Sequence, residues 1–166
     1  MAMTALPPEV CEEILEEFRQ QCLDFSDSLL QELAYNYGLD AICDIDSLNI
    51  IEIISKPGPF DVFTGGATSQ HLADGCLSDL LIEAEAKGIK VGCVAGALLV
   101  VKQTNMRFNT FVSMHSRLMD TLHPSVQLMQ AMYCENSPEG GVNLKLILTG
   151  IDTVDEFVGP RERCSD

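Results

Sequence analysis

The sequence has little positive charge in its first half and no negative charge over a long stretch of its second half. Residues 1–86 contain only two basic residues, Arg19 and Lys56, beside 17 acidic ones, whereas residues 87–166 carry eight of each sign. The whole net charge of −15 therefore lies in the first half. Residues 87–119 contain no Asp or Glu. Because phosphate contacts need grouped Lys and Arg, this composition argues against direct binding of nucleic acid.

The sequence also lacks a long apolar run. The longest, residues 91–101, is too short to cross a bilayer as a helix. The first ten residues lack the basic flank and apolar stretch of a secretory signal, and the glutamates that follow are atypical of a mitochondrial presequence. We expect a soluble intracellular protein, cytoplasmic or nuclear, without a membrane partner.

Motifs for metal, nucleotide or covalent chemistry are missing as well. His71 and Cys76 form an isolated H-x4-C pair, and no CxxC or HxxxH accompanies them. Residues 63–69 (FTGGATS) contain glycines but neither a lysine nor the spacing of a phosphate-binding loop. The seven cysteines are odd in number and widely spread, which is typical of reduced, buried thiols. We predict no metal, no cofactor and no catalytic residue.

Helical patterns are clear in the acidic half. Residues 7–21 begin with two prolines, carry glutamates in the first turns and repeat apolar residues at helical spacing. A second helix is predicted from Ser26 or Asp27 to Gly38, so that the two form a hairpin. Residues 45–55 fit either a short helix capped by Asp46 or Ser47, or a buried strand. Two prolines around Gly58 then end this element.

The pattern over residues 91–122 predicts one long central helix. Apolar and small polar residues recur there in alternating steps of four and three, which keeps one stripe of a helix facing a partner. Further helices are predicted after Pro124 and over residues 144–158. The predicted fold is mainly α, a single-domain helical bundle. It comprises an acidic helical subdomain at 1–56, a loop or hinge at 57–69, a helical core at 70–158 and a flexible tail at 159–166.

An α/β fold is the alternative that the sequence leaves open. Residues 60–96 can be divided into a strand, a glycine-containing loop, a helix ending at Gly88 and a buried strand, as in a βαβ unit. Residues 142–148 would then form a third strand. On this interpretation the chain is a small enzyme or ligand-binding domain whose site lies at the loop of residues 64–69.

The favoured functional hypothesis is a non-enzymatic interaction protein, an adaptor or complex subunit. Self-association is assigned to the apolar stripe and to a ridge of glycines spaced by four, through Gly92, Gly96, Asn105, Phe108, Val112, His115 and Met119. Docking of a basic protein partner is assigned to the acidic residues Glu12, Glu13, Glu16, Glu17, Asp24 and Asp27.

Two further hypotheses concern the charge. The acidic surface could imitate nucleic acid and so inhibit a protein with a basic groove. The chain's own basic stretch, residues 87–119, could also neutralise part of the acidic half, within one copy or between two.

Overall fold

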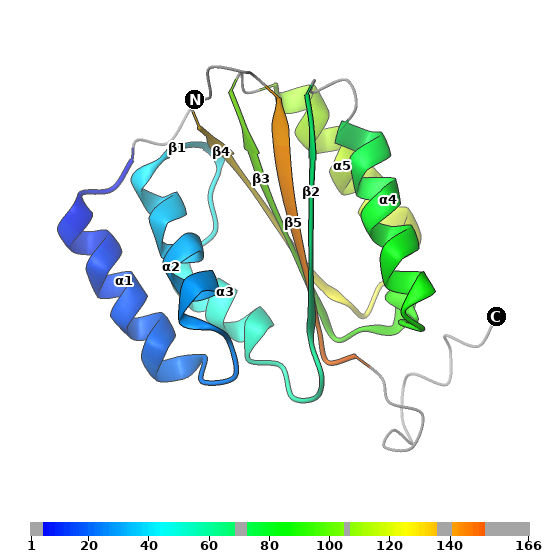
Figure 1. Ribbon diagram of the computed structural model, residues 1–166, viewed down its shortest axis with the longest axis horizontal. Coiled ribbons are helices and arrows are strands. Elements are labelled where there is room, and N and C mark those ends of the chain that lie inside the picture. The colour runs from blue at the N-terminus through cyan, green and yellow to red at the C-terminus, as the bar shows by residue number, and fades with distance from the viewer. Residues whose placement is uncertain (1–4, 69–72, 105–106, 136–140, 152–166) are drawn as a thin grey trace.

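A five-stranded mixed sheet runs through the centre of the computed structural model, with helices on both faces (Figure 1). The structure describes residues 5–68, 73–104, 107–135 and 141–151. In chain order its elements are α1 (Pro8–Gln21), α2 (Asp27–Tyr35), η1 (Asn36–Gly38), β1 (Asp40–Cys43), α3 (Ser47–Ile54), β2 (Asp61–Ala67), α4 (Ala73–Ala86), η3 (Val91–Cys93), β3 (Gly96–Gln103), α5 (Phe108–Thr121), β4 (Gln127–Cys134) and β5 (Val142–Thr149).

The strand order is β1-β4-β3-β5-β2. β3 lies at the centre, where it pairs with β4 in parallel and with β5 antiparallel over its full length. β2 pairs antiparallel with the other side of β5, so β2 and β3 run in the same direction with β5 between them. The unit β2–α4–β3 therefore has the strand–helix–strand order of the α/β alternative, although its two strands are not neighbours.

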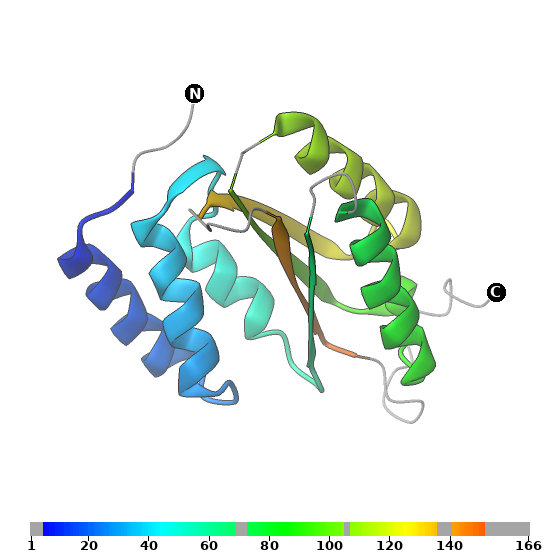
Figure 2. The same cartoon turned by 45° about the horizontal axis from the view of Figure 1, so that its top comes forward.

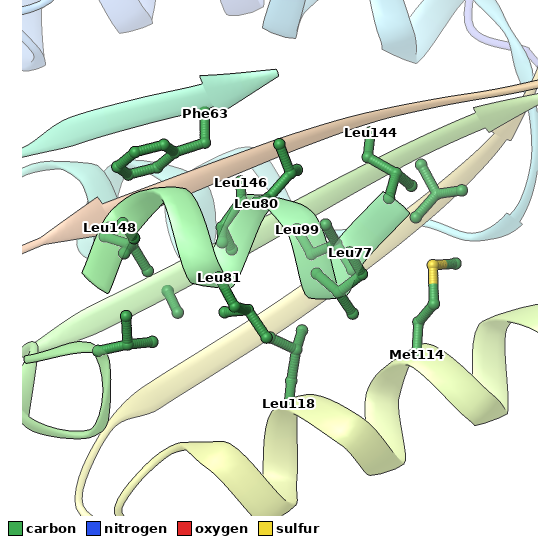
Figure 3. Close-up of a cluster of buried hydrophobic side chains, with 14 of the residues drawn as sticks. Phe63, Leu77, Leu80, Leu81, Leu99, Met114, Leu118, Leu144, Leu146 and Leu148 are labelled. Atoms are coloured by element: carbon green, nitrogen blue, oxygen red, sulfur yellow. The ribbon is translucent and has the colours of Figure 1, made fainter. Parts of the chain in front are cut away.

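Two apolar cores hold helices to the two faces of the sheet (Figure 2). One core lies between the sheet and α4 with α5, and Figure 3 shows its central side chains, including Phe63, Leu77, Leu99, Met114 and Leu118. The other core lies between the opposite face and α1 to α3, and includes Phe18, Leu33, Ile53, Leu98 and Ile147. Because helices cover both faces, the apolar stretch Gly96–Val101 of β3 is buried throughout.

Local capping explains the helices of the acidic half. The N-terminal hairpin forms as predicted, because α1 begins at Pro8 and Ser26 caps α2, its hydroxyl accepting from the Leu29 N–H at 3.3 Å. Residues 47–54 form the helical alternative, and the Asp46 carboxylate accepts from the Leu48 N–H at 2.9 Å. Gly88 ends α4 as predicted, with φ of +83° and an Ile89 N–H bond back to the Ala84 carbonyl.

The predicted helical bundle is wrong. Residues 91–122 form a 3-10 turn, the central strand β3 and the helix α5 rather than one long helix. An apolar stretch matches a helical period and a strand period equally well, and here the pairing of β3 with β4 and β5 decides for the strand. The helices predicted after Pro124 and from residue 144 are likewise the strands β4 and β5. The tail predicted at residues 159–166 lies outside the described residues.

Candidate interaction surface and polar pocket

An apolar stripe is exposed along α5. Phe108, Val112 and Met119 are 60%, 48% and 56% exposed, and their spacing of four and seven places them on one side of the helix. Met114 and Leu118 of the same helix are fully buried against the sheet. α5 therefore has an inner side that packs in the core and a separate outer stripe of large apolar side chains. We call Phe108, Val112, His115 and Met119 the α5 stripe.

The rings of Phe108 and His115, both in the stripe, stack on the ring of Phe111, which lies between them along the helix. The Phe108 and Phe111 ring centroids lie 5.8 Å apart, and those of Phe111 and His115 lie 6.1 Å apart with the rings tilted by only 5°. His115 is half-buried, and its Nδ1 atom has no hydrogen-bond partner among the described residues. Stacking of this kind fixes the side chains in place, so the stripe presents a preorganised surface.

The opposite flank of α5 is attached to α4. The Ser113 hydroxyl donates to the Asp74 carboxylate at 2.6 Å, and the Arg117 guanidinium donates to the Ser78 hydroxyl at 2.7 Å. On a helical projection, Ser113 and Arg117 lie on the side of α5 away from Val112 and Met119. The α5 stripe consequently faces away from α4.

The structure brings together four of the seven residues assigned to self-association from the sequence. Phe108, Val112, His115 and Met119 form the stripe. Gly92 lies in η3 and Gly96 begins β3, so no helical glycine ridge exists. Asn105 lies outside the described residues.

The predicted acidic face is only partly available for a partner. Glu12, Glu13 and Glu16 are exposed on α1, and Asp24 is exposed in the turn that follows. Glu17 is half-buried and accepts from the Ser47 hydroxyl at 3.4 Å.

Asp27, the sixth residue of that face, is engaged within the hairpin. Its carboxylate accepts from the Arg19 guanidinium at 2.7 Å and from the Gln31 amide at 2.6 Å. The hydrogen bond from Arg19 lowers the pKa of the Asp27 carboxyl.

A polar pocket opens on the face of the sheet that carries α1 to α3. Its volume is about 350 Å³, and it is lined by Glu32, Thr64, Gly65, Val100, Lys102, Glu135, Asn143, Leu144 and Lys145. Thr64 and Gly65 belong to the segment at which the α/β alternative places a ligand site, although they lie in strand β2 rather than in a loop. The sequence analysis missed the two lysines. A lysine whose side chain lies on the covered face of a strand would identify such a site, but this face is known only once the strands have been assigned.

The thiols are mostly free, as predicted. Five cysteines of the described residues are free. Burial raises the pKa of Cys22 to about 11, which makes its thiol a poor nucleophile. Within the part of the chain that the structure describes, no three His, Cys, Asp or Glu side chains gather as metal ligands, and no helix has the length and apolar character needed to span a membrane.

Comparison with known proteins finds similarity in fold only. No protein-family model and no curated protein matches the sequence. An FtsZ mutant from M. jannaschii superposes with a TM-score of 0.64 at 15% identity, over 88% of this chain and 42% of that one. An empty FtsZ dimer from the same organism gives 0.62 at 12% identity, over 93% and 46%.

Another similar solved structure is that of TubZ from Bacillus thuringiensis serovar israelensis, in GDP-form protofilaments. It gives a TM-score of 0.55 at 14% identity, over 87% of this chain and 49% of that one. The chain thus has the fold of part of the FtsZ and TubZ structures and spans less than half the length of each.

Proposed function

We propose that this chain is a protein-interaction module that self-associates through the α5 stripe. The observation that carries the proposal is the exposure of Phe108, Val112 and Met119 on one side of a helix whose opposite flank is already attached to α4. Aligned large apolar side chains on a folded surface are typical of protein interfaces, whereas single exposed ones are ordinary.

Charge supports a second copy as the occupant. Two copies of a chain with net charge −15 repel each other, and the charge lies in residues 1–86. α5 lies in the half with no net charge, at the end of a stretch without Asp or Glu up to residue 119. The α5 stripe is therefore an apolar surface within the half that has no net charge, and α4 beside it carries the exposed acids Asp79, Glu83 and Glu85.

The similar structures agree with this proposal. One is described as an FtsZ dimer and another as TubZ protofilaments, so copies of those proteins assemble. This chain covers less than half of either protein. We extend only the capacity for self-association to it, in an intracellular setting, and propose neither a cofactor nor catalysis.

Sedimentation analysis of the wild type and two matched variants tests the proposal. Val112→Glu places a charge in the centre of the stripe, and Ile82→Glu places the same charge at a 62%-exposed apolar residue of α4 outside it. The wild type should form dimers or larger species as concentration rises, Ile82→Glu should match it, and Val112→Glu should remain monomeric. The proposal is refuted if the wild type stays monomeric at every concentration, or if both variants lose self-association to the same extent.

The acidic face of α1 is a second candidate surface, for a basic protein partner. Glu12, Glu13 and Glu16 are exposed on α1, and Arg19, which bonds to Asp27, also lies 4.0 Å from the Glu16 carboxylate. Such a contact should weaken as salt rises, because exposed charges are screened beyond about 10 Å at 0.1 M ionic strength. Capture of a partner that is unaffected by salt, or by replacing these three glutamates with glutamine, rules out this role.

A further inference from the structure

Two lysines point from neighbouring strands into the polar pocket. In the β3–β5 register, Lys102 is opposite Asn143 and Val100 is opposite Lys145. Directly opposed side chains share a face of the sheet, and these four share the face that carries Leu98 and Ile147. The two ammonium groups are therefore diagonal neighbours on one surface.

Both lysines are largely withdrawn from water and share one carboxylate. Their side chains are 13% and 15% exposed, and both are paired with Glu32 of α2. Lys102 Nζ lies 3.6 Å from Glu32 Oε1, and Lys145 Nζ bonds to Oε2. Lysines are rarely buried without full compensation, because removing an ammonium from water is costly. Two ammonium groups thus share the Glu32 carboxylate, while Glu135, the second carboxylate of the pocket, pairs with neither of them.

The rest of the pocket offers hydrogen bonds that are not used within the described residues. Glu135 lines the pocket but pairs with no described base, and the exposed Thr64 hydroxyl and Asn143 amide have no hydrogen-bond partner among the described residues. Gly66 leaves room for that amide, since a Cβ at residue 66 would lie 2.9 Å from Asn143 Oδ1. The pocket combines two ammonium groups, free polar groups and the apolar side chain of Val100, as small-molecule sites do.

We propose that this pocket binds a small organic anion through its carboxylate, which pairs with Lys102 and Lys145. Each carboxylate of a ligand brings one negative charge to the two ammonium groups, whereas a phosphate dianion would bring two to the same point beside Glu135. Glu32 occupies the lysines in the absence of ligand. Its side chain is 38% exposed, so it can turn toward water when a ligand carboxylate takes its place.

Calorimetric titration with acetate, succinate and inorganic phosphate tests the assignment, with sodium chloride holding the ionic strength constant. Glu32→Gln removes the competing carboxylate and should strengthen succinate binding about tenfold. Lys145→Met should weaken it by a similar factor. Lys90→Met, at an exposed lysine outside the pocket, is the matched control and should leave binding unchanged.

A second variant covers the case in which Lys145→Met fails to fold. Asn143 is exposed and lies outside both cores, so Asn143→Ala should fold normally and weaken succinate binding severalfold. Val112→Glu should bind succinate as the wild type does, because the α5 stripe lies on the other side of the sheet. Failure of self-association and failure of anion binding are thus separate results.

Three outcomes overturn the proposal. The first is a Glu32→Gln variant that binds succinate no more tightly than the wild type. The second is equal loss in Lys90→Met and Lys145→Met, which would mean unspecific attraction to lysine. The third is tighter binding of phosphate than of succinate, which would remove the carboxylate from the assignment.

Discussion

Gly96→Ala should destabilise the fold strongly without changing self-association. A Cβ at residue 96 would lie 2.7 Å from Thr149 Oγ1 and 3.2 Å from Ile53 Cγ2. Neither atom moves freely, because the Thr149 hydroxyl donates to the Ile53 carbonyl at 2.8 Å and both residues are fully buried. Displacing Thr149 loses that bond, at about 1 kcal/mol, and crowds the core, at about 1–3 kcal/mol. The expected loss in free energy of unfolding is about 2–4 kcal/mol.

A double-mutant cycle, measured by urea unfolding, gives the coupling energy between residues 96 and 149. Thr149→Ala removes the atom that the new Cβ meets, so the double variant should be about 1–2 kcal/mol more stable than additivity predicts. Gly75→Ala is the matched control: its Cβ meets nothing within 4 Å in α4, and the change should stabilise the helix by about 0.5–1 kcal/mol. Additive single effects, or a Gly96→Ala variant as stable as the wild type, would refute the close approach of α3 to the start of β3.

The remaining predictions concern ionisation and packing. Burial and the nearby Asp44 carboxylate raise the pKa of Tyr37 and Tyr133 above the ordinary tyrosine value of about 10. The neutral side chains therefore stabilise the fold below about pH 10, and this stabilisation is lost as the pH rises further. Urea midpoints above pH 10 should show a loss of about 1.4 kcal/mol per pH unit for each tyrosine, and Tyr133→Phe should remove about half of the slope. Cys22, with its pKa of about 11, should react with a disulfide reagent at pH 8 about a hundredfold more slowly in the folded protein than after unfolding. Leu118→Ala should lower the free energy of unfolding by about 2–5 kcal/mol, because this side chain is fully buried in the core that α5 forms with α4 and the sheet. A decrease below about 1 kcal/mol in thermal or urea unfolding would contradict that packing.

The beginnings and ends of several helices were predictable from the sequence, because each is set by one residue and the backbone close to it. Pro8 begins α1, Ser26 and Asp46 cap α2 and α3, and Gly88 ends α4. Each residue acts on backbone groups no more than a few positions away, so no knowledge of the fold is needed. The hairpin of the acidic half was found for this reason.

The sheet was not predictable in the same way, because its strands are specified by partners distant in the chain. β3 is apolar at nearly every position, so it carries no period that separates strand from helix. It becomes a strand by pairing with β4 and with β5, which begins nearly forty residues after β3 ends. Only the α/β alternative, with a strand, a loop, a helix and a buried strand over residues 60–96 and a third strand at 142–148, contained the strand–helix–strand order of β2, α4 and β3.

The α5 stripe was recognisable before the fold was known, although for an incomplete reason. Phe108, Val112, His115 and Met119 do lie on one helix, and their spacing was read correctly. The sequence could not show that the inner side of the same helix is formed by Met114 and Leu118. That distinction between inner side and outer stripe requires the sheet against which α5 packs.

The charge asymmetry acquires a physical role once the two halves are placed in space. Lys87 pairs with Asp61 at 3.4 Å, and Lys102 pairs with Glu32 at 3.6 Å, so bases of the second half neutralise acids of the first within one copy. The α1 glutamates Glu9, Glu12, Glu13 and Glu16 have no such compensation from the second half and stay exposed. Repulsion between copies therefore disfavours contact through α1, and α5 lies on the other face of the sheet (Figure 2). In the proposed self-association, the same acids disfavour contact between two α1 surfaces and leave the α5 stripe as the apolar alternative.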